Sequence, residues 1–266
     1  MGVDRFRWRN SHIHIFNIMS QIKKIDFWRS YFRSFLIQAG WNYQRMMALG
    51  FLWTILPLVE KLYTTPEERI SFLNRHLGSF NSNPYFANYA VGSVAKLEEE
   101  HIPAEEISKF KQALIGPLGA LGDSLIWVRL RPALAILGMI LALKYGILGG
   151  VVFFCLFNIF QFYLRYVALE KGYSLGFGLT THLAGRTYPQ LIRVFSMIGA
   201  ILFGFFFIFC LNDFASFEKI GALLFFLVIF AFSIWGLKKN LNPGLVFIIS
   251  LLGSLGLDII LKSIIR

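Results

Sequence analysis

The sequence has little charge and almost no cysteine. Asp, Glu, Lys and Arg make up 15% of its 266 residues, and Cys155 and Cys210 are its only cysteines. Soluble domains carry about 25% charged residues, so this composition argues against an ordinary soluble domain. Both cysteines lie in apolar runs without a CxxC or Cys/His cluster, and we therefore predict neither a zinc site nor a disulfide framework.

The common motifs of enzymes are also missing. The sequence contains no GxSxG, no GxxxxGK[ST] phosphate-binding loop and no HExxH zinc motif. Its histidines do not cluster at ligand spacing apart from His12 and His14, which would point to different faces of a helix. We predict no catalytic residue, no metal and no cofactor on this chain.

Apolar residues, in contrast, are abundant. They make up 56% of the chain, which includes 29 phenylalanines. A net charge of +11 could attract nucleic acid, but much of the basic charge lies within residues 1–33 and in short loops. That distribution is typical of orientation in a membrane. We therefore predict an all-α integral membrane protein that contacts lipid and no nucleic acid.

The character of the chain changes near residue 112. We predict a basic cytoplasmic arm over 1–31, amphipathic and re-entrant or broken helices over 32–112, and a transmembrane helical region over 113–266. Since a helix needs about 20 apolar residues to cross a bilayer, the last region has room for about four to five transmembrane helices. The candidate spans are 125–143, 147–169, 194–212, 220–237 and 244–261.

Basic residues in the short loops set the predicted orientation. The loops 170–193 and 238–243 both carry basic residues and are separated by two spans, so they lie on one side, together with the basic arm. We predict that the N-terminus is cytoplasmic and that the C-terminus lies on the outer side of the membrane.

Residues 32–63 are apolar without forming a clean span. Gln38, Asn42 and Arg45 recur at i, i+4 and i+7, which places them on one face of a helix, and glycines and Pro57 interrupt the run. Two interpretations stay open. The segment is either an amphipathic helix in the membrane interface or a broken, re-entrant helix whose polar stripe lines a cavity.

The segment 74–100 contains a helix start and a charged helix end. Asn83 followed by Pro84 is typical of an N-cap and the first helical residue. The helix ends in three glutamates, Glu98 to Glu100, which oppose the helix dipole at that end. We therefore expect these carboxylates to have either water or basic side chains as partners, and we favour a solvated cytoplasmic helix end.

The stretch "IGPLGALGDSLIWVRLRP", residues 115–132, is apolar but interrupted by three glycines and two prolines. We expect Gly116 and Pro117 to end one helix and Asp123 to cap the next, which would begin at Ser124. A carboxylate within a span is costly and tends to be functional. Asp123 could both cap a helix and accept hydrogen bonds from a ligand.

Paired broken segments are the best sequence pointer to a binding site in transporters. The polar groups near the two breaks suit an uncharged polar molecule such as a sugar. The flat faces of Trp41, Trp53 and Trp127 suit a sugar ring, although interfacial belts are an alternative for each tryptophan. The predicted substrate-binding residues are Gln38, Trp41, Asn42, Arg45, Asn81, Asn83 and Asp123.

Several stretches resemble the IID component of the mannose-type phosphoenolpyruvate-dependent sugar phosphotransferase system, a bacterial membrane permease. They are "QAGWNYQRMMALGFLWTILPLVEKLY", "RHLGSFNSNPYFANYAVGSVAKLEEE", "IGPLGALGDSLIWVRLRP", "LFNIFQFYLRYVALEKGYSLG" and "LKKNLNPGLVFIISLLG". The resemblance covers residues 32–261.

This resemblance implies a location in the bacterial inner membrane and a IIC membrane subunit as partner. It further implies phosphate relay by cytoplasmic IIA and IIB domains, a sugar substrate, and no phosphorylated residue on this chain. Pairs of IIC and IID subunits are similar to elevator transporters and assemble as trimers of heterodimers. Some members also serve as receptors for bacteriocins.

Three departures from the family pattern stand out. Gln44 replaces a usual glutamate, Ser124 replaces a frequent proline, and a long hydrophilic insert is reduced to residues 212–219. These departures leave room for a diverged, non-transporting interaction or receptor subunit. A further alternative is a membrane enzyme acting on lipid, which would rely on the cluster of Glu98, Glu99, Glu100 and His101.

Overall fold

The computed structural model describes residues 22–212, with side chains to residue 206, and isolated residues between 227 and 253. The chain divides into two compact units, Met1–Leu202 and Phe203–Arg266. In the second unit the described positions beyond 226 are helical apart from a turn at Lys239. The account below concerns the first unit.

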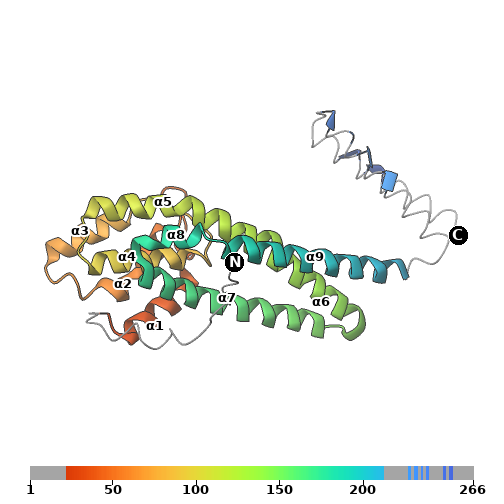
Figure 1. The fold of residues 1–266 in the computed structure, drawn as a ribbon, viewed down its shortest axis with the longest axis horizontal. Coiled ribbons are helices and arrows are strands. Elements are labelled where there is room, and N and C mark those ends of the chain that lie inside the picture. The colour runs from red at the N-terminus through yellow and green to blue at the C-terminus, as the bar shows by residue number, and fades with distance from the viewer. Residues whose placement is uncertain are drawn as a thin grey trace, which may run out of the picture. The chain divides into compact units, whose positions relative to one another are not determined.

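Helices build the first unit (Figure 1), and the predicted all-α class is confirmed for the described residues. In chain order the elements are α1 (Lys24–Arg33), the 3-10 turn η2 (Ser34–Leu36), α2 (Ala48–Val59), α3 (Pro66–His76), α4 (Ala87–Glu99), α5 (Ala104–Gly122), the π-helical segment η3 (Asp123–Leu130), α6 (Arg131–Tyr145), α7 (Leu148–Leu175), the 3-10 turn η4 (Gly176–Gly178), α8 (Leu179–Leu183) and α9 (Thr187–Asn212), which continues into the second unit.

Helix α4 is the most deeply buried element, and residues 87–95 are buried without exception. Glycines bring its backbone against that of α7. A Cβ on Gly92 would lie 2.2 Å from the carbonyl oxygen of Leu169, and one on Gly172 would lie 2.3 Å from that of Tyr89. No side chain fits at either position, so the α4–α7 contact depends on both glycines.

Helices α5, η3 and α6 join into one uninterrupted helical stretch, Ala104–Tyr145. Pro117 lies inside α5, and Asp123 begins a π-helical segment instead of capping a new helix. The expected break at Gly116 and Pro117 is therefore wrong, as is the cap before Ser124. Proline removes one backbone hydrogen bond, which neighbouring turns of a long apolar helix can compensate, so it need not end the helix.

Helices α6 and α7 form a hairpin and lie side by side (Figure 1). Gly146 makes the turn with a φ of 58°, a conformation that favours glycine. The two backbones approach closely above the turn, since a Cβ on Gly149 would lie 2.2 Å from the carbonyl oxygen of Gly138.

Within the described residues, three helical stretches are long and apolar enough to cross a membrane: Ala104–Tyr145, Leu148–Leu183 and Thr187–Phe206. They contain or overlap the predicted spans 125–143, 147–169 and 194–212, but each helical stretch begins or ends well outside the apolar window. Helices are longer than predicted here because amphipathic turns extend them beyond the apolar core. The predicted spans 220–237 and 244–261 lie outside the continuously described residues.

Residues 32–63 do not form a single helix. After α1 and η2, turns lead to α2, so Gln38, Asn42 and Arg45 do not share a helical face and that expectation is wrong. Asn42 explains the difference: its side-chain oxygen accepts the backbone N–H groups of Gln44 at 3.1 Å and Arg45 at 2.9 Å. An asparagine that satisfies nearby backbone groups in this way competes with helix formation.

The glycine and proline of α2 do not interrupt that helix either. Pro57 lies within it. A Cβ on Gly50 would lie 1.8 Å from the carbonyl oxygen of Ile37, so glycine lets the preceding turn pack directly on α2. The depth of this segment in a membrane, interfacial or re-entrant, stays a prediction.

Candidate functional site

Two chain segments that carry predicted binding residues lie against each other. We call them the 37–47 turn and the 78–83 link, after their residues. The backbone N–H of Met47 donates to the carbonyl oxygen of Phe80 at 2.8 Å, and the N–H of Phe80 donates to that of Arg45 at 3.3 Å. The two segments therefore hold each other by backbone hydrogen bonds, although their sequence separation exceeds thirty residues.

Helix α5 supports the same pair of segments. The side-chain nitrogen of Gln112 donates to the carbonyl oxygen of Ser79 at 2.9 Å. This contact places the 78–83 link beside the long helical stretch that carries Asp123.

Asn83 and Asp123 meet directly. The Asn83 Nδ2 donates to the Asp123 Oδ1 at 2.9 Å, and its own Oδ1 accepts the backbone N–H of Tyr85 at 3.0 Å. Asn83 is buried, whereas Asp123 is exposed, so the Asp123 carboxylate can accept a further donor. Gly122 makes the contact possible, because a Cβ there would lie 2.4 Å from the Cβ of Asn83.

Asn83 precedes the turn that leads into α4 and is not the N-cap of that helix. Its carbonyl oxygen accepts the N–H of Ala87 at 2.9 Å, but α4 begins at Ala87 and the intervening residues form a turn. The predicted helix start at Pro84 is therefore three residues too early. The side chain of Asn83 serves both the turn and Asp123.

The remaining predicted residues present their side chains to the outside. Gln38, Trp41, Arg45 and Asn81 are exposed, and no side-chain hydrogen bond to another described residue is formed by any of them. Asn42 differs, since its amide is used within the turn and its Nδ2 donates to the carbonyl oxygen of Gly40 at 3.2 Å. The structure thus brings the predicted residues onto neighbouring segments and leaves most of their polar groups available.

Among the three tryptophans, Trp127 lies closest to the Asn83–Asp123 pair along the chain. Its ring is 5.6 Å from that of Tyr85, and the Arg131 guanidinium lies 5.1 Å from its centre. Trp53 lies elsewhere, and Arg33 covers its ring at 3.9 Å. Trp127 is 36% exposed and can offer an edge or part of a face to a ligand.

The serine that departs from the family pattern has a structural role. Both the carbonyl oxygen and the hydroxyl of Ser124 accept from the Arg129 Nη1 at 2.6 Å. Arg129 also donates from Nε to the hydroxyl of Ser196 on α9 at 2.9 Å. Ser124 therefore helps to satisfy an arginine inside the π-helical segment and to join it to α9.

A second polar centre was not predicted from the sequence. Glu98 is buried, and its carboxylate is held by Arg75, whose Nε and Nη2 donate at 2.9 and 2.8 Å, and by His76 Nε2 at 2.7 Å. Tyr63 donates its hydroxyl to the same carboxylate. We call these four residues the Glu98 cluster. The expectation of a solvated end is wrong for Glu98, because α3 folds back and covers the end of α4.

Burial and hydrogen bonding set the protonation states of this cluster. Burial lowers the pKa of His76 to about 4, although the hydrogen bond with Glu98 opposes that shift. Burial alone would raise the pKa of Glu98, but the hydrogen bonds from His76 and Tyr63 and the charge of Arg75 hold it below its usual range. Near neutral pH the cluster therefore contains a carboxylate, an arginine cation and a neutral imidazole.

Lys111 from α5 closes the cluster on its other side. Its ammonium lies 3.3 Å from the carbonyl oxygen of His76, to which it donates, and 4.9 Å from the centre of the Phe51 ring. Lys111 is buried, and it falls on the apolar stripe of α5 with Ile107, Leu114 and Leu118. A lysine on the apolar face of a helix was the one feature of the sequence that indicated a buried polar partner for it.

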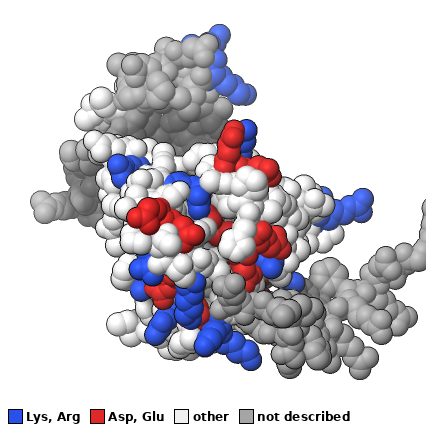
Figure 2. Space-filling model, turned by 90° about the vertical axis from the view of Figure 1, so that its left-hand side faces the viewer, with Lys and Arg blue, Asp and Glu red and all other residues white. Residues whose placement is uncertain are grey.

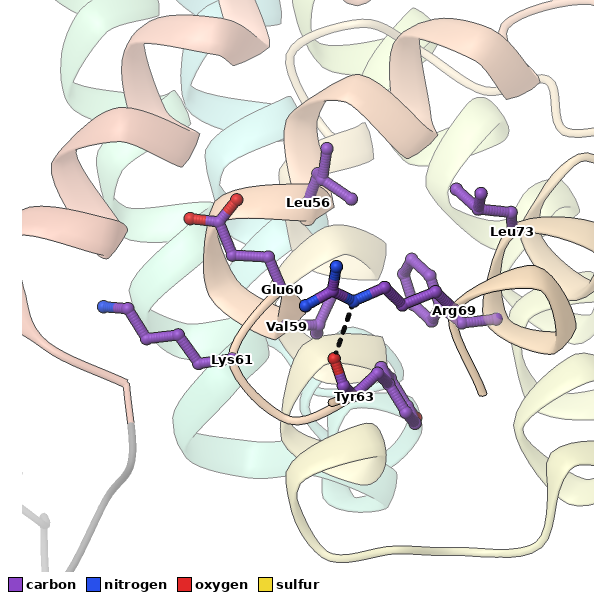
Figure 3. Close-up of a pocket in the computed structure, with 8 residues that line it drawn as sticks. Leu56, Val59, Glu60, Lys61, Tyr63, Arg69 and Leu73 are labelled. Carbon is purple, nitrogen blue, oxygen red and sulfur yellow. Dashed lines mark hydrogen bonds between the residues drawn. The ribbon is translucent and has the colours of Figure 1, made fainter. Parts of the chain in front are cut away.

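Tyr63 connects the Glu98 cluster to an open pocket of about 490 Å³ (Figure 3). Arg69 leans over it and donates from Nε to the backbone carbonyl of Tyr63 at 2.9 Å. The pocket floor is apolar, and its rim carries Glu60 and Lys61. Acidic and basic side chains lie close together on the face of the molecule that Figure 2 shows.

Long apolar helices, small-residue contacts between them and a polar pair on the exposed side of a candidate span define an α-helical membrane protein. The comparisons with known proteins agree. The profile of the "PTS system mannose/fructose/sorbose family IID component" matches residues 21–212. The chain belongs to this family of IID components.

Two relatives illustrate the match. The chain is 32% identical over 197 residues to the "PTS system sorbose-specific EIID component" of Lacticaseibacillus casei, which covers 72% of this chain and 70% of that protein. It is 34% identical over 180 residues to the "PTS system mannose-specific EIID component" of Escherichia coli strain K12, covering 65% and 64%.

Two solved structures of membrane proteins also resemble this chain. A chain described as "Structure of membrane protein" matches with a TM-score of 0.70 and 27% identity, over 89% of this chain and 96% of that one. A chain of the complex of the mannose transporter ManYZ with microcin E492 matches with a TM-score of 0.57 and 28% identity, over the same shares.

Proposed function

We propose that this chain is the IID half of a sugar permease, which binds and moves a hexose or amino sugar together with a IIC membrane subunit. Cytoplasmic IIA and IIB domains would supply the phosphate, so this chain needs no catalytic or phosphorylated residue. The Asn83–Asp123 pair carries the proposal. An exposed carboxylate on a candidate span is unfavourable against lipid and calls for a polar ligand, water or a partner subunit.

The neighbouring segments supply the other contacts. The 37–47 turn and the 78–83 link carry Gln38, Trp41, Arg45 and Asn81 with their polar or aromatic groups exposed. Amides and a carboxylate are suited to sugar hydroxyls, and a tryptophan edge or face is suited to the sugar ring. Asn42 would act by shaping the turn.

Movement of this site is the second part of the proposal. A block that contains the turn, the link and η3 would shift across the bilayer relative to a fixed scaffold, as in an elevator transporter. Three such IIC–IID pairs would form the complete permease. The ManYZ complex, in which a structural neighbour of this chain is found, supports the pairing with a IIC subunit.

The proposed orientation keeps the N-terminus and the loop after α7 in the cytoplasm and the C-terminus outside, in the inner membrane of a bacterium. Arg186 and Arg193 beside the start of α9 support this assignment. Reporter fusions at both termini would test it, and an outward N-terminus would contradict it.

The central experiment is phosphoenolpyruvate-dependent sugar uptake by cells that express the chain with its IIC, IIA and IIB partners. Asp123→Asn and Asn83→Ala are each expected to reduce uptake about tenfold to a hundredfold, because a hydrogen bond to a charged or buried group is lost at the site. Glu105→Gln is the matched control, since it removes an exposed carboxylate from the same helix. Full uptake by both site variants at normal membrane levels would remove this pair from the sugar site.

A second candidate function is a non-transporting interaction or receptor subunit. It is favoured by the structural neighbour that was captured with microcin E492 and by the neutral Gln44 in the turn. Binding of labelled sugar to the purified IIC–IID complex separates the two proposals, since the receptor subunit would bind none. The lipid enzyme is not proposed, because Arg75 and His76 occupy the carboxylate of Glu98.

A further inference from the structure

Arg165 is a buried cation in an apolar helix. It lies on α7 within the candidate span Leu148–Leu183 and is 5% exposed. Among the described residues, no aspartate or glutamate forms an ion pair with it. Burying a charge without an acidic partner is costly, so such residues in spans usually have a function.

Backbone and aromatic groups hold the guanidinium in place of a carboxylate. Its Nη1 donates to the carbonyl oxygen of Ser34 at 2.7 Å. Its centre lies 5.0 Å from the ring of Phe35 and 5.0 Å from the ring of Tyr85. The faces of two aromatic rings can stabilise a desolvated cation electrostatically.

These contacts reach the segments of the candidate sugar site. Ser34 and Phe35 directly precede the 37–47 turn, and Tyr85 follows Asn83 by two residues. The ring of Tyr85 in turn lies 5.6 Å from that of Trp127, in the same π-helical segment as Asp123. The Arg165 guanidinium therefore contacts Ser34 and Phe35, which precede the 37–47 turn. It also contacts Tyr85, which follows the 78–83 link and packs near Trp127 of η3.

Asn88 reinforces the same junction from α4. Its Nδ2 donates to the hydroxyl of Ser34 and to the carbonyl oxygen of Arg165, both at 3.0 Å. Three elements that are distant in sequence, namely η2, α4 and α7, are thus joined by polar contacts at one point.

We propose that Arg165 is a positioning residue for the sugar site. It holds the entry to the 37–47 turn and the Tyr85–Trp127 ring pair in one arrangement on α7 without touching the sugar. The expected effect of Arg165 on sugar binding rests on the proposed function. Its expected effect on the order of the 37–47 turn does not. A site held in this way would move with α7 as one body.

The test compares Arg165→Met with Arg165→Lys and with the control Tyr31→Phe. Tyr31 also joins the first helical segment to α7, since its hydroxyl donates to the carbonyl oxygen of Phe162 at 3.2 Å. Its ring lies 5.4 Å from that of Phe35, and Tyr31→Phe keeps this ring contact while it removes the hydroxyl. Hydrogen exchange at the amides of Met46 and Met47 reports the order of the turn in the purified full chain, without sugar. Uptake kinetics of the complete permease report the effect on the site.

Arg165→Met is expected to speed exchange at these two amides about tenfold or more, because the turn loses its anchor. It is also expected to raise the KM for sugar more than it lowers the maximal rate. Arg165→Lys should recover part of both effects, because its ammonium keeps a cation over the rings but loses the planar fork. Tyr31→Phe should leave both readouts unchanged.

Wild-type exchange and KM in Arg165→Met would overturn the proposal, as would equal changes in Tyr31→Phe. Where Arg165→Met does not insert, Arg165→Lys and Asn88→Ala decide the question through the same two readouts. A permease that takes up no sugar even as wild type would contradict the proposed function and leave the exchange result as the test of the anchor.

Discussion

Two regions of the first unit hold an arginine by different kinds of contact, and Arg75 is half-buried whereas Arg165 is buried. Arg75 lies beside a carboxylate, and with Glu98, His76 and Tyr63 it forms a cluster outside the candidate spans. Arg165 lies within a candidate span and is held by a carbonyl oxygen and two rings. Helix α4 takes part in both regions, with Glu98 at its end and Asn88 near its start.

The two kinds of contact predict different roles, namely stability of the fold for the Glu98 cluster and positioning of the site for Arg165. Removing one member of a buried, charge-matched cluster leaves the others desolvated and uncompensated, which costs folding free energy. Removing Arg165 leaves one carbonyl oxygen without its donor and two rings without their cation, so the fold should tolerate that loss better. We therefore expect the Glu98 cluster to fix the fold and Arg165 to fix the site.

The largest expected effect is that of Glu98→Ala. It leaves the buried His76 and the half-buried Arg75 without their acceptor and should lower the free energy of unfolding by about 3–5 kcal/mol. Thermal unfolding of the purified protein in detergent measures it. Glu105→Ala is the control, since that ion pair with Lys109 is exposed and is worth at most about 1 kcal/mol. Equal stability of the two variants would show that the Glu98 cluster does not hold the fold.

An intermediate effect is expected where the glycines of α4 and α7 bring the two backbones together. Gly172→Ala would push a methyl group against the backbone of Tyr89, and overpacking of this kind should cost about 1–3 kcal/mol. Gly150→Ala is the control on the same helix, because no atom lies within 4 Å of its added Cβ. Unchanged unfolding of Gly172→Ala would mean that the two helices lie farther apart than described.

The effect that is smallest near neutral pH concerns the titration of His76. Burial lowers the pKa of His76 to about 4, below its ordinary value of 6.5, so between these values the unfolded chain binds a proton that the folded chain does not. Stability should therefore be complete above pH 6.5 and fall as the pH drops toward about 4, by up to about 1.4 kcal/mol per pH unit.

His76→Gln should flatten that pH slope, and the control His101→Gln should not, because His101 is exposed. Unfolding midpoints measured from pH 7 to pH 4 distinguish the two. A slope that persists in His76→Gln would assign the titration to another group. No comparable slope is expected from the Arg165 region, which has no carboxylate or imidazole in the contacts described.

The sequence predicted helices and apolar spans well, because hydrophobic length and periodicity are local properties. The predictions from sequence failed at positions where neighbouring residues favour different local structures. Gly116, Pro117 and Asp123 together resemble a helix break, yet apolar flanks carried the helix through them. Asn42 resembles one position of a polar helical stripe, yet its side chain bonded its own backbone and made a turn.

The candidate site was predicted as a list of residues, and its geometry was not. Asn83 and Asp123 were both expected to cap helices, and the structure shows them hydrogen-bonded to each other across Gly122. Glu98 was placed in solvent because nothing in the local sequence shows that α3 covers it. Arg165 gave no signal beyond being a cation in an apolar helix.

The sequence by itself determined that this protein is helical, apolar over its second half and a member of a IID family, since composition and motifs need no partner in space. Tertiary structure alone decided which polar groups meet. Hydrogen bonds and ion pairs act over about 3 Å, and residues such as Asn83 and Asp123 or Ser34 and Arg165 come within that distance only when distant helices pack.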